Sequence, residues 1–519
     1  MAFRIDDPPR RSRGARSPDQ EPLPASPTQA ESPLLDLEPG LVWHFFDGIR
    51  RIPRPSKKED RIAAAVVEWA ERQGFAAVTD EAGNVVVRVP AARELNDAPI
   101  VVLQAHLDMV GEKNADTEHD FDADPIRVHV DGDWVRARGT TLGADNGVGV
   151  AMAMAAAVDP HIKRGPLEML FTLDEETGLN GAQALDGSLV QGRLMINLDA
   201  EEDDTVYIGC AGAAGVVARL PLTRKLARGG TFYRLALTGL RGGHSGVDID
   251  AGRGNAVKLL ARVLVAAQDA GLGQLDYRLV GFQGGDKPNA IAREAFAELY
   301  LDEDEIDAWR RHLDESAQQL RRQLGAADPG LKLELEPSPT HATPLDRAST
   351  VQYLRLLDAL PHGPIAMSTE LEGLVETSAN LASTRTEETI ASFFLSLRSS
   401  SDPALDGLGQ SIASLFRLAG AAVDRLAGYS GWQPDPENAI TRTTTAVYEQ
   451  LFDASPTLAA VHAGVECGVV ARRVPGLAAV SIGPTILGAH SPEERVSIES
   501  VGKSYRWLHH LLEELARPS

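Results

Sequence analysis

The stretch 167–182, "LEMLFTLDEETGLNGA", joins an apolar run to three adjacent carboxylates, Asp174, Glu175 and Glu176. The apolar run is typical of a strand buried on both faces of a sheet. Adjacent carboxylates repel one another, so the end of a buried strand is an unfavourable place for them unless positive charge lies nearby. A solvated turn would accommodate the three side chains, and so would a bound cation.

Further buried runs surround this stretch. The segments 98–110, "APIVVLQAHLDMV", and 192–202, "GRLMINLDAEE", are predicted strands, and 146–158, "NGVGVAMAMAAAV", is predicted to be a helix of small residues that packs closely on the sheet. Strands that alternate with helices predict an α/β sandwich, in which functional residues gather at strand ends.

The pattern changes from about Gly212. Alternating strands and amphipathic helices in the next two hundred or so residues predict an antiparallel sheet with helices on one face, and no internal repeat is evident. Buried runs of the first kind return near the C-terminus, at 461–473 and 477–484. We therefore expect an α/β catalytic domain, 36–212 and 428–519, interrupted by an inserted α+β domain, 213–427.

Composition excludes several function classes. The formal net charge of −23 argues against nucleic acid and against an anionic membrane surface as partners. Two cysteines in 519 residues fit a reducing compartment, and no membrane-spanning run or secretory signal is evident, so we expect a cytoplasmic protein. Residues 1–35 are rich in Pro, Arg and Ser and are predicted to form a disordered tail.

Histidine and carboxylate side chains follow several of the buried runs. His106 and Asp108 point to the same face if they continue a strand, which lets the carboxylate steady the imidazole, although most such triplets are incidental. Asp145 lies at a glycine-flanked turn that begins a helix, where a helix cap is the alternative interpretation. Asp199 ends another buried run, and His490 lies in a loop bounded by glycine and proline. Surface or capping roles would explain each residue singly, but not the whole set.

Eight segments in this order resemble those of the M20 metallopeptidases, and within that group the aminoacyl-histidine dipeptidases, also called peptidase D or cytosolic non-specific dipeptidases. They are "HLDMV", "RGTTLGADNGVGVAMA", "DEETGLNGA", "INLDAEE", "GGHSG", "DKPNAIAREAFA", "HAGVECG" and "HSPEE". The resemblance runs from about Leu35 to the C-terminus. It implies a metal-binding catalytic domain and an insert that serves as a lid and dimerisation domain.

The resemblance also implies a dinuclear metal site. His106 and Asp199 would bind one divalent cation, Glu176 and His490 the other, and Asp145 would bridge the two, followed by a cis peptide bond. Imidazole and carboxylate ligands suit Zn²⁺ best and also accept Mn²⁺ or Co²⁺. Offsetting charge from two cations would explain why the carboxylates of the opening stretch lie so close together.

Catalytic and substrate-binding roles follow from the same resemblance. Glu175 would be the general base acting on a hydroxide that bridges the metals, and Asp108 would orient His106. His244, in "GGHSG", would cross a homodimer interface to stabilise the oxyanion in the partner's site, although a histidine in a loop is the plainer interpretation. Asn289 and Arg398 would hold the substrate's backbone and carboxylate, but a solvated arginine is the alternative for Arg398.

The expected function is hydrolysis of dipeptides, with Xaa-His dipeptides such as carnosine among the substrates. One alternative is another hydrolase on the same scaffold, an aminoacylase, deacetylase or tripeptidase. A second is a scaffold without catalysis that serves as a binding protein. His462 and Glu466, in "HAGVECG", are expected to line or support the site without an assigned role.

Overall fold

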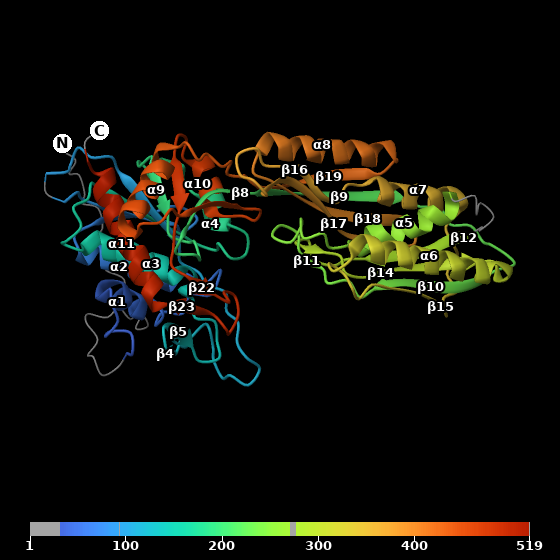
Figure 1. Cartoon of the computed structure of the whole chain (residues 1–519), viewed down its shortest axis with the longest axis horizontal. Helices are drawn as coiled ribbons and strands as arrows, with labels where there is room; N and C mark the ends of the chain where they lie inside the picture. The colour runs from blue at the N-terminus through green and yellow to red at the C-terminus, as the bar shows by residue number, and fades with distance from the viewer. Residues whose placement is uncertain (1–31, 93, 270–276, 518–519) are drawn as a thin grey trace, which may run out of the picture.

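The computed structural model describes residues 32–92, 94–269 and 277–517, which form two lobes that lie side by side (Figure 1). Most of the predicted N-terminal tail, residues 1–31, lies outside the described residues. Its last part is ordered, since Ser32 and Leu34 are buried and Leu34 belongs to the core of the first lobe.

The first lobe is built on an eight-stranded sheet with the order β1-β2-β6-β3-β7-β21-β8-β20. The strands are β1 (Ala76–Thr79), β2 (Val85–Val89), β3 (Val101–His106), β6 (Leu167–Thr172), β7 (Leu194–Asn197), β8 (Thr205–Cys210), β20 (Thr457–Val461) and β21 (Ala478–Ser481). A smaller four-stranded sheet beside it contains β4 (Val128–Asp131), β5 (Trp134–Ala137), β22 (Ile486–Leu487) and β23 (Arg495–Ser497).

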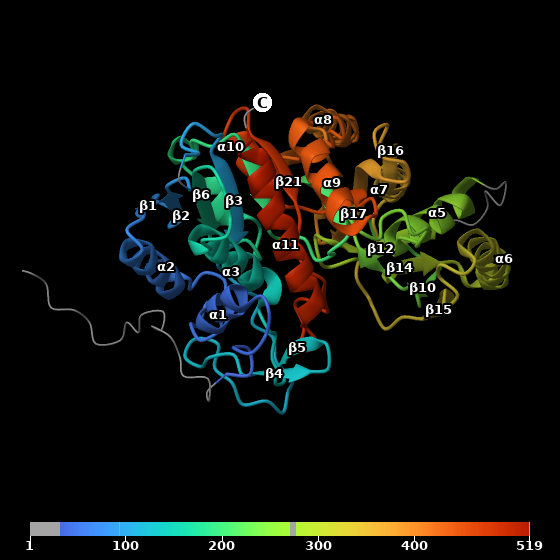
Figure 2. The same ribbon diagram turned by 60° about the vertical axis from the view of Figure 1, so that its left-hand side comes forward.

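Helices cover both faces of the eight-stranded sheet. One core contains side chains of α1 (Gly40–Ile49), α2 (Asp60–Arg72), α3 (Ala144–Val158), α9 (Ala439–Phe452) and α11 (Ile498–Leu515). In Figure 2, α1, α3 and α11 lie side by side in this lobe. The other face packs on α4 (Asn180–Ala184) and α10 (Glu466–Arg473), so the strands between are buried on both sides. The predicted α/β sandwich is confirmed.

Parallel pairing at the centre of this sheet brings the ends of its strands to one edge. β3 pairs in parallel with both β6 and β7, and β21 pairs in parallel with β7. Because side chains that follow parallel strands emerge at the same edge, the loops after β3, β6 and β7 meet there.

The second lobe is a nine-stranded antiparallel sheet with the main order β15-β10-β14-β12-β17-β18-β9-β19. Its strands are β9 (Gly212–Pro221), β10 (Thr231–Thr238), β12 (Tyr277–Gly284), β14 (Ala295–Leu301), β15 (Lys332–Pro337), β16 (Gly363–Met367), β17 (Val375–Thr386), β18 (Ile390–Ser399) and β19 (Ala422–Tyr429). The helices α5 (Ala256–Asp269), α6 (Ile306–Leu324), α7 (Arg347–Ala359) and α8 (Asp402–Leu418) share one core with the sheet, so they cover a single face.

This sheet contains a repeat of topology that the sequence did not reveal. The elements β10, α5, β12, β14, α6 and β15 give the strand order β15-β10-β14-β12, and β9, α7, β17, β18, α8 and β19 give the matching order β19-β9-β18-β17. The halves meet where β12 pairs with β17 in antiparallel register. The two halves share an order of elements rather than residues, which explains why no sequence repeat was evident.

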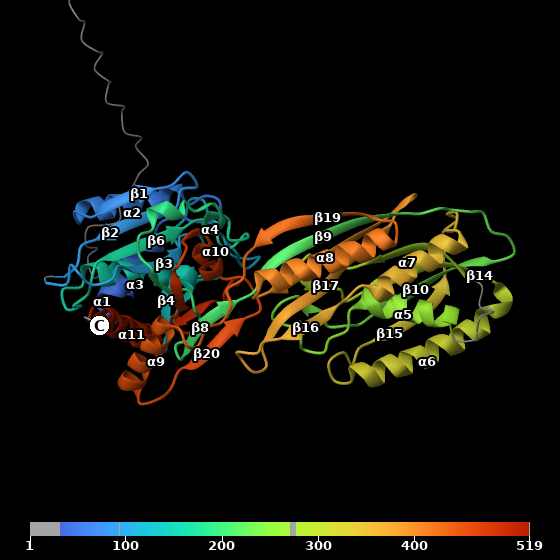
Figure 3. The same ribbon diagram turned by 90° about the horizontal axis from the view of Figure 1, so that it is seen from above.

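The lobes are joined by a chain that crosses between them twice. β8 ends at Cys210 and β9 begins at Gly212, and after β19 the chain returns to the first lobe (Figure 3). In the part of the chain that the structure describes, no helix combines the length and apolar character needed to cross a membrane.

Candidate active site

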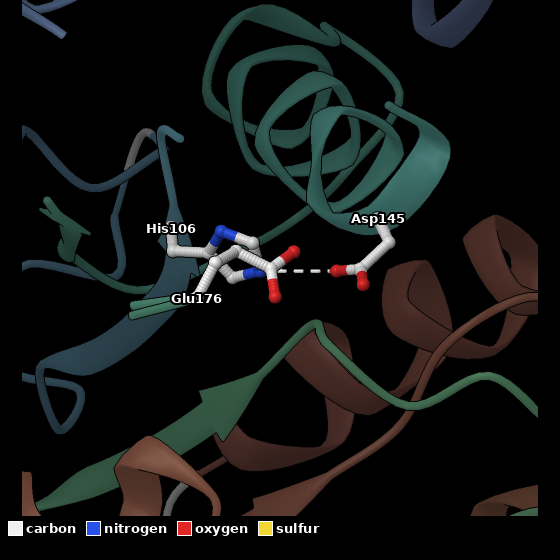
Figure 4. Close-up of side chains that lie close together, drawn as sticks. All are labelled: His106, Asp145 and Glu176. Carbon is white, nitrogen blue, oxygen red and sulfur yellow. Dashed lines mark hydrogen bonds and ion pairs between the residues drawn. The ribbon is translucent and has the colours of Figure 1, made fainter. Parts of the chain in front are cut away.

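The ends of neighbouring strands bring the predicted site residues together. His106 is the last residue of β3, Glu175 and Glu176 follow β6, and Asp199 follows β7. Asp145 lies near the start of α3 at the same edge. Figure 4 shows His106, Asp145 and Glu176 pointing toward one another.

Asp145 lies between two imidazoles. Its Oδ1 is 3.0 Å from Nε2 of His106, and its Oδ2 is 3.1 Å from Nε2 of His490. His106 Nε2 also lies 3.3 Å from Asp199 Oδ1, and His490 Nε2 lies 2.9 Å from Glu176 Oε2. One imidazole thus lies at each oxygen of Asp145, and a second carboxylate lies beside each imidazole.

The helix-cap interpretation of Asp145 is wrong. The residue before the helix is Gly143, with a left-handed φ of 67°, and no side chain makes a cap hydrogen bond there. Asp145 itself has an extended backbone conformation, and its peptide bond to Asn146 is cis. Its carboxylate oxygens contact the two histidines rather than the helix N–H groups.

Asp108 connects two parts of the site. Its Oδ1 lies 3.3 Å from His106 Nδ1 and accepts the backbone N–H of Glu175, and its Oδ2 accepts the N–H of Glu176 and the hydroxyl of Ser56. Burial raises the pKa of this carboxyl, but contact with His106 outweighs burial and lowers it to about 2. An ionised Asp108 thus positions both His106 and the turn that carries Glu175 and Glu176.

Two positioning residues were not identified from the sequence. The carboxylate of Glu494, 2% exposed, accepts the backbone N–H groups of residues 142–145 at 2.7 to 3.3 Å. The guanidinium of Arg54, also 2% exposed, donates to the carbonyls of Leu107, Asp108 and Gly143. Glu494 belongs to the "HSPEE" segment that was noted for His490, whereas nothing in the local pattern distinguished Arg54.

The site attracts positive charge. Hydrogen bonds to Asp145 and Glu176 raise the pKa of His490 to about 11. Burial lowers the pKa of His106, but Asp199, Asp108 and Asp145 outweigh burial and raise it well above its usual value. Burial raises the pKa of Asp199 to about 6, and the charges of Asp145 and Glu176 act in the same direction.

These residues could hold a divalent cation. Ligand atoms of His106, Asp145 and Glu176 lie within 4.8 Å of one another. Glu176 Oε1 is buried and accepts no hydrogen bond within the described ranges, and buried Asp199 Oδ1 accepts none either, although it lies 3.3 Å from His106 Nε2. A bound cation would offset the cost of burying these oxygens. Imidazole and carboxylate together form the donor set that zinc prefers.

Glu175 is not among the candidate metal ligands, and its carboxyl group has a raised pKa. Burial raises its pKa well above the usual value, and the charges of Asp199, Glu466 and Glu176 raise it further, although His106 opposes them. The carboxyl lines the same cavity as His106 and Asp145. A carboxylate with a raised pKa beside a metal site has the properties of a general base.

The cavity has a second wall, formed by the inserted lobe. Its volume is about 440 Å³, within the range of small-molecule sites, and its lining includes His244, Arg398 and Tyr429 beside the residues of the first lobe. Arg398 lies at the end of β18, and its Nη groups are 3.3 Å from Tyr429 Oη and 3.5 Å from His244 Nε2. Nε of Arg398 is buried and has no partner among the described residues.

His244 reaches the cavity of its own chain. It lies on β11 (Gly243–His244), which pairs with β13 (Ala290–Ile291) in the half of the lid that begins with β10. This half of the lid places His244 in the wall of the cavity of its own chain, so His244 can reach a site without a partner subunit. The homodimer itself stays a prediction.

Other predicted residues lie nearby. Asn289 is exposed and is not among the cavity-lining residues, although its carbonyl accepts the N–H of Ser245 beside His244. His462 Nε2 lies 2.7 Å from the hydroxyl of Ser378 on β17, which links the two lobes. Buried Glu466 accepts hydrogen bonds of 2.6 Å from both Gln104 and Thr172 behind the site.

Comparison with known proteins gives a consistent result. The sequence pattern described as peptidase family M20/M25/M40 matches residues 102–514. The chain is 41% identical over 485 residues to the cytosol non-specific dipeptidase of Escherichia coli K12, covering 93% of this chain and 99% of that protein.

Solved structures agree with the sequence comparison. The aminoacylhistidine dipeptidase from Vibrio alginolyticus superposes with a TM-score of 0.87 at 40% identity, covering 93% of this chain and 98% of that one. The aminopeptidase PepT from Bacillus cereus, at 15% identity, a TM-score of 0.56 and coverage of 93% and 100%, shares the fold alone.

Proposed function

Because this chain belongs to the peptidase family M20/M25/M40 and is a peptide-bond hydrolase, we propose that it is a cytoplasmic dipeptidase with two divalent cations, whose substrates include Xaa-His dipeptides such as carnosine. The observation that carries the metal assignment is Asp145, which presents one oxygen to each of two histidines. His106 and Asp199 would hold one cation, Glu176 and His490 the other, with Zn²⁺ the best match to the donor set.

Bound metal would polarise the scissile carbonyl and lower the pKa of a water molecule in the site. Glu175 would take the proton of that water and pass it to the leaving amine. Asp108 supports both roles, since it holds the backbone of Glu175 and the ring of His106.

His244 is suited to stabilise the developing oxyanion. Its Nδ1 accepts the N–H groups of Gly246 and Val247, each at 3.2 Å, which favours the tautomer with the proton on Nε2. The 3.5 Å contact between Nε2 and Arg398 then joins two donors and is not a hydrogen bond. Burial and the charge of Arg398 lower the pKa of this imidazole, which keeps it neutral near pH 7. A neutral Nε2–H can donate a hydrogen bond to the oxyanion.

Arg398 is suited to bind the substrate's terminal carboxylate. Its buried, unpartnered Nε and its two long contacts leave donors free for a bidentate ion pair. Asn289, beside the His244 turn, would contact the substrate backbone only after a movement of the lid toward the first lobe.

The first test is a hydrolysis panel with metal-stripped protein. Dipeptides that include carnosine, a tripeptide and N-acetyl amino acids would be assayed before and after Zn²⁺, Mn²⁺ or Co²⁺ is restored. We expect dipeptides to be cleaved only with metal, and a Glu175→Ala variant to lose about 10²- to 10⁴-fold in kcat while it retains metal. Cleavage of N-acetyl amino acids or tripeptides instead of dipeptides would contradict the substrate assignment, and failure to bind metal would contradict the ligand set.

A further inference from the structure

Glu201 is a cavity carboxylate that the proposed mechanism does not use. It follows Asp199 by two residues, beyond the end of β7, and its carbonyl accepts the N–H of Ile486 at 3.1 Å. The side chain is half-buried and lines the same cavity as Asp145 and His490.

The carboxylate of Glu201 has no hydrogen bond and no ion pair within the part of the chain that the structure describes. Its neighbour Glu202, in contrast, accepts the hydroxyl of Tyr207 at 2.8 Å. A half-buried carboxylate without a protein partner is costly, and a cationic group of a ligand would offset that cost.

The cavity is polarised from one side to the other. Glu201 lines the cavity from the first lobe, beside Asp145 and Asp199. Burial raises the pKa of Glu201 to about 8, and the charges of Asp145 and Asp199 act in the same direction, so a cationic group bound beside it would favour its ionised form. The guanidinium of Arg398 lines the cavity from the lid, beside His244 and Tyr429. A carboxyl group of the first lobe and a guanidinium of the lid therefore face the cavity from different walls.

We propose that Glu201 binds the α-ammonium group of the substrate and so selects dipeptides over N-acylated amino acids. A dipeptide is a zwitterion, with an ammonium at one end and a carboxylate at the other, and its charges match this polarity. An N-acyl amino acid has the carboxylate but lacks the ammonium. This inference rests on the proposed dipeptidase function, because only a substrate with a free amino terminus has the group that Glu201 would bind.

The test compares Glu201→Gln with wild-type protein, both loaded with metal, and with Glu202→Gln as the matched control. Kinetics would be measured on a dipeptide. Binding of that dipeptide and of its N-acetyl derivative would be measured by calorimetry in the Glu175→Ala background. We expect Glu201→Gln to raise KM and weaken dipeptide binding by about 10- to 100-fold, with a smaller change in kcat. Binding of the N-acetyl derivative should change by less than about 2-fold, and Glu201→Asp should restore part of the loss.

Each contrary outcome has a separate meaning. Unchanged dipeptide binding in Glu201→Gln, or an equal loss for the N-acetyl derivative, would overturn the assignment of Glu201. A fall in metal content per chain would overturn it too, because Glu201 would then act on the metal site. A larger effect in Glu202→Gln would move the role to that residue. If the wild-type protein cleaves no dipeptide, the proposed function fails, independently of how Glu201→Gln behaves.

Discussion

The two walls of the cavity are held in different ways. On the wall of the first lobe, His106, Glu176 and Asp199 lie at or after the ends of buried strands, and hydrogen bonds to Asp108 fix the turn that carries Glu175 and Glu176. On the wall of the lid, His244 and Arg398 meet at 3.5 Å and Arg398 keeps a buried donor without a protein partner. The proposed metal ligands and general base are thus held in place by the protein, whereas Arg398, assigned to substrate recognition, keeps a donor free to bind the substrate.

Among changes outside the general base, the largest effect is expected on the wall of the first lobe, from Glu494→Gln. The amide nitrogen of glutamine cannot accept the backbone N–H groups that the carboxylate accepts at residues 142–145, so the segment that carries Asp145 should shift. We expect metal affinity and activity to fall by about 10- to 100-fold, and thermal stability to fall as well.

Metal affinity would be measured by competition with a chelator, beside Glu493→Gln, which changes the exposed neighbour in the same way. Equal metal affinity in Glu494→Gln and wild type would mean that the wall of the first lobe is not held as rigidly as its hydrogen bonds indicate.

On the wall of the lid, Arg398→Ala is expected to weaken substrate binding rather than metal binding. This change removes the guanidinium proposed to bind the substrate carboxylate, so KM should rise by about 10-fold or more, while metal content and folding stay as in the wild type. Arg398→Lys should recover part of the loss, because it keeps the charge but not the bidentate geometry.

Steady-state kinetics on a dipeptide and on its C-terminal amide would check the role of Arg398, with Arg425→Ala as the control, an arginine that pairs with Asp406 on the outer part of the lid. A wild-type enzyme that accepts the amide as readily as the acid would contradict this role.

The smallest effect at neutral pH is expected where the lobes meet, at His462. Burial and the charge of Arg398 lower the pKa of His462 to about 4, whereas an unfolded histidine titrates near 6.5. Between these values the unfolded chain binds a proton that the folded chain does not, so stability is full above about pH 6.5 and falls as the pH drops toward 4, by about 3 kcal/mol.

His462→Gln should flatten this part of the pH profile, because glutamine can accept the Ser378 hydroxyl but does not titrate. Unfolding by denaturant at pH 7, 6, 5 and 4 would measure the difference, with His510→Gln on α11 as an exposed control. If His462→Gln and wild type show parallel profiles, the pKa of His462 does not differ between the folded and the unfolded protein, and the prediction is wrong.

Much of the first lobe could be predicted from local pattern. Continuous apolar runs such as 167–173 are buried strands, and the carboxylates and imidazoles that follow them were identified because polar groups at the ends of buried strands stand out. Glu494 and Arg54 were missed for a physical reason. Both side chains bind backbone groups of segments that are remote in the sequence. A local sequence pattern does not show which remote segments come into contact in the fold.

The sequence by itself determined the α/β character of the first lobe, the antiparallel insert, and the residue types that gather at one sheet edge. Only the tertiary structure decided that the lid is built from two halves of the same topology, and that His244 reaches the cavity of its own chain. It also decided that Asp145 turns one oxygen to each histidine. Periodicity and strand ends are local properties of the chain, whereas these arrangements arise from pairing between segments as distant as β12 and β17, or Asp145 and His490.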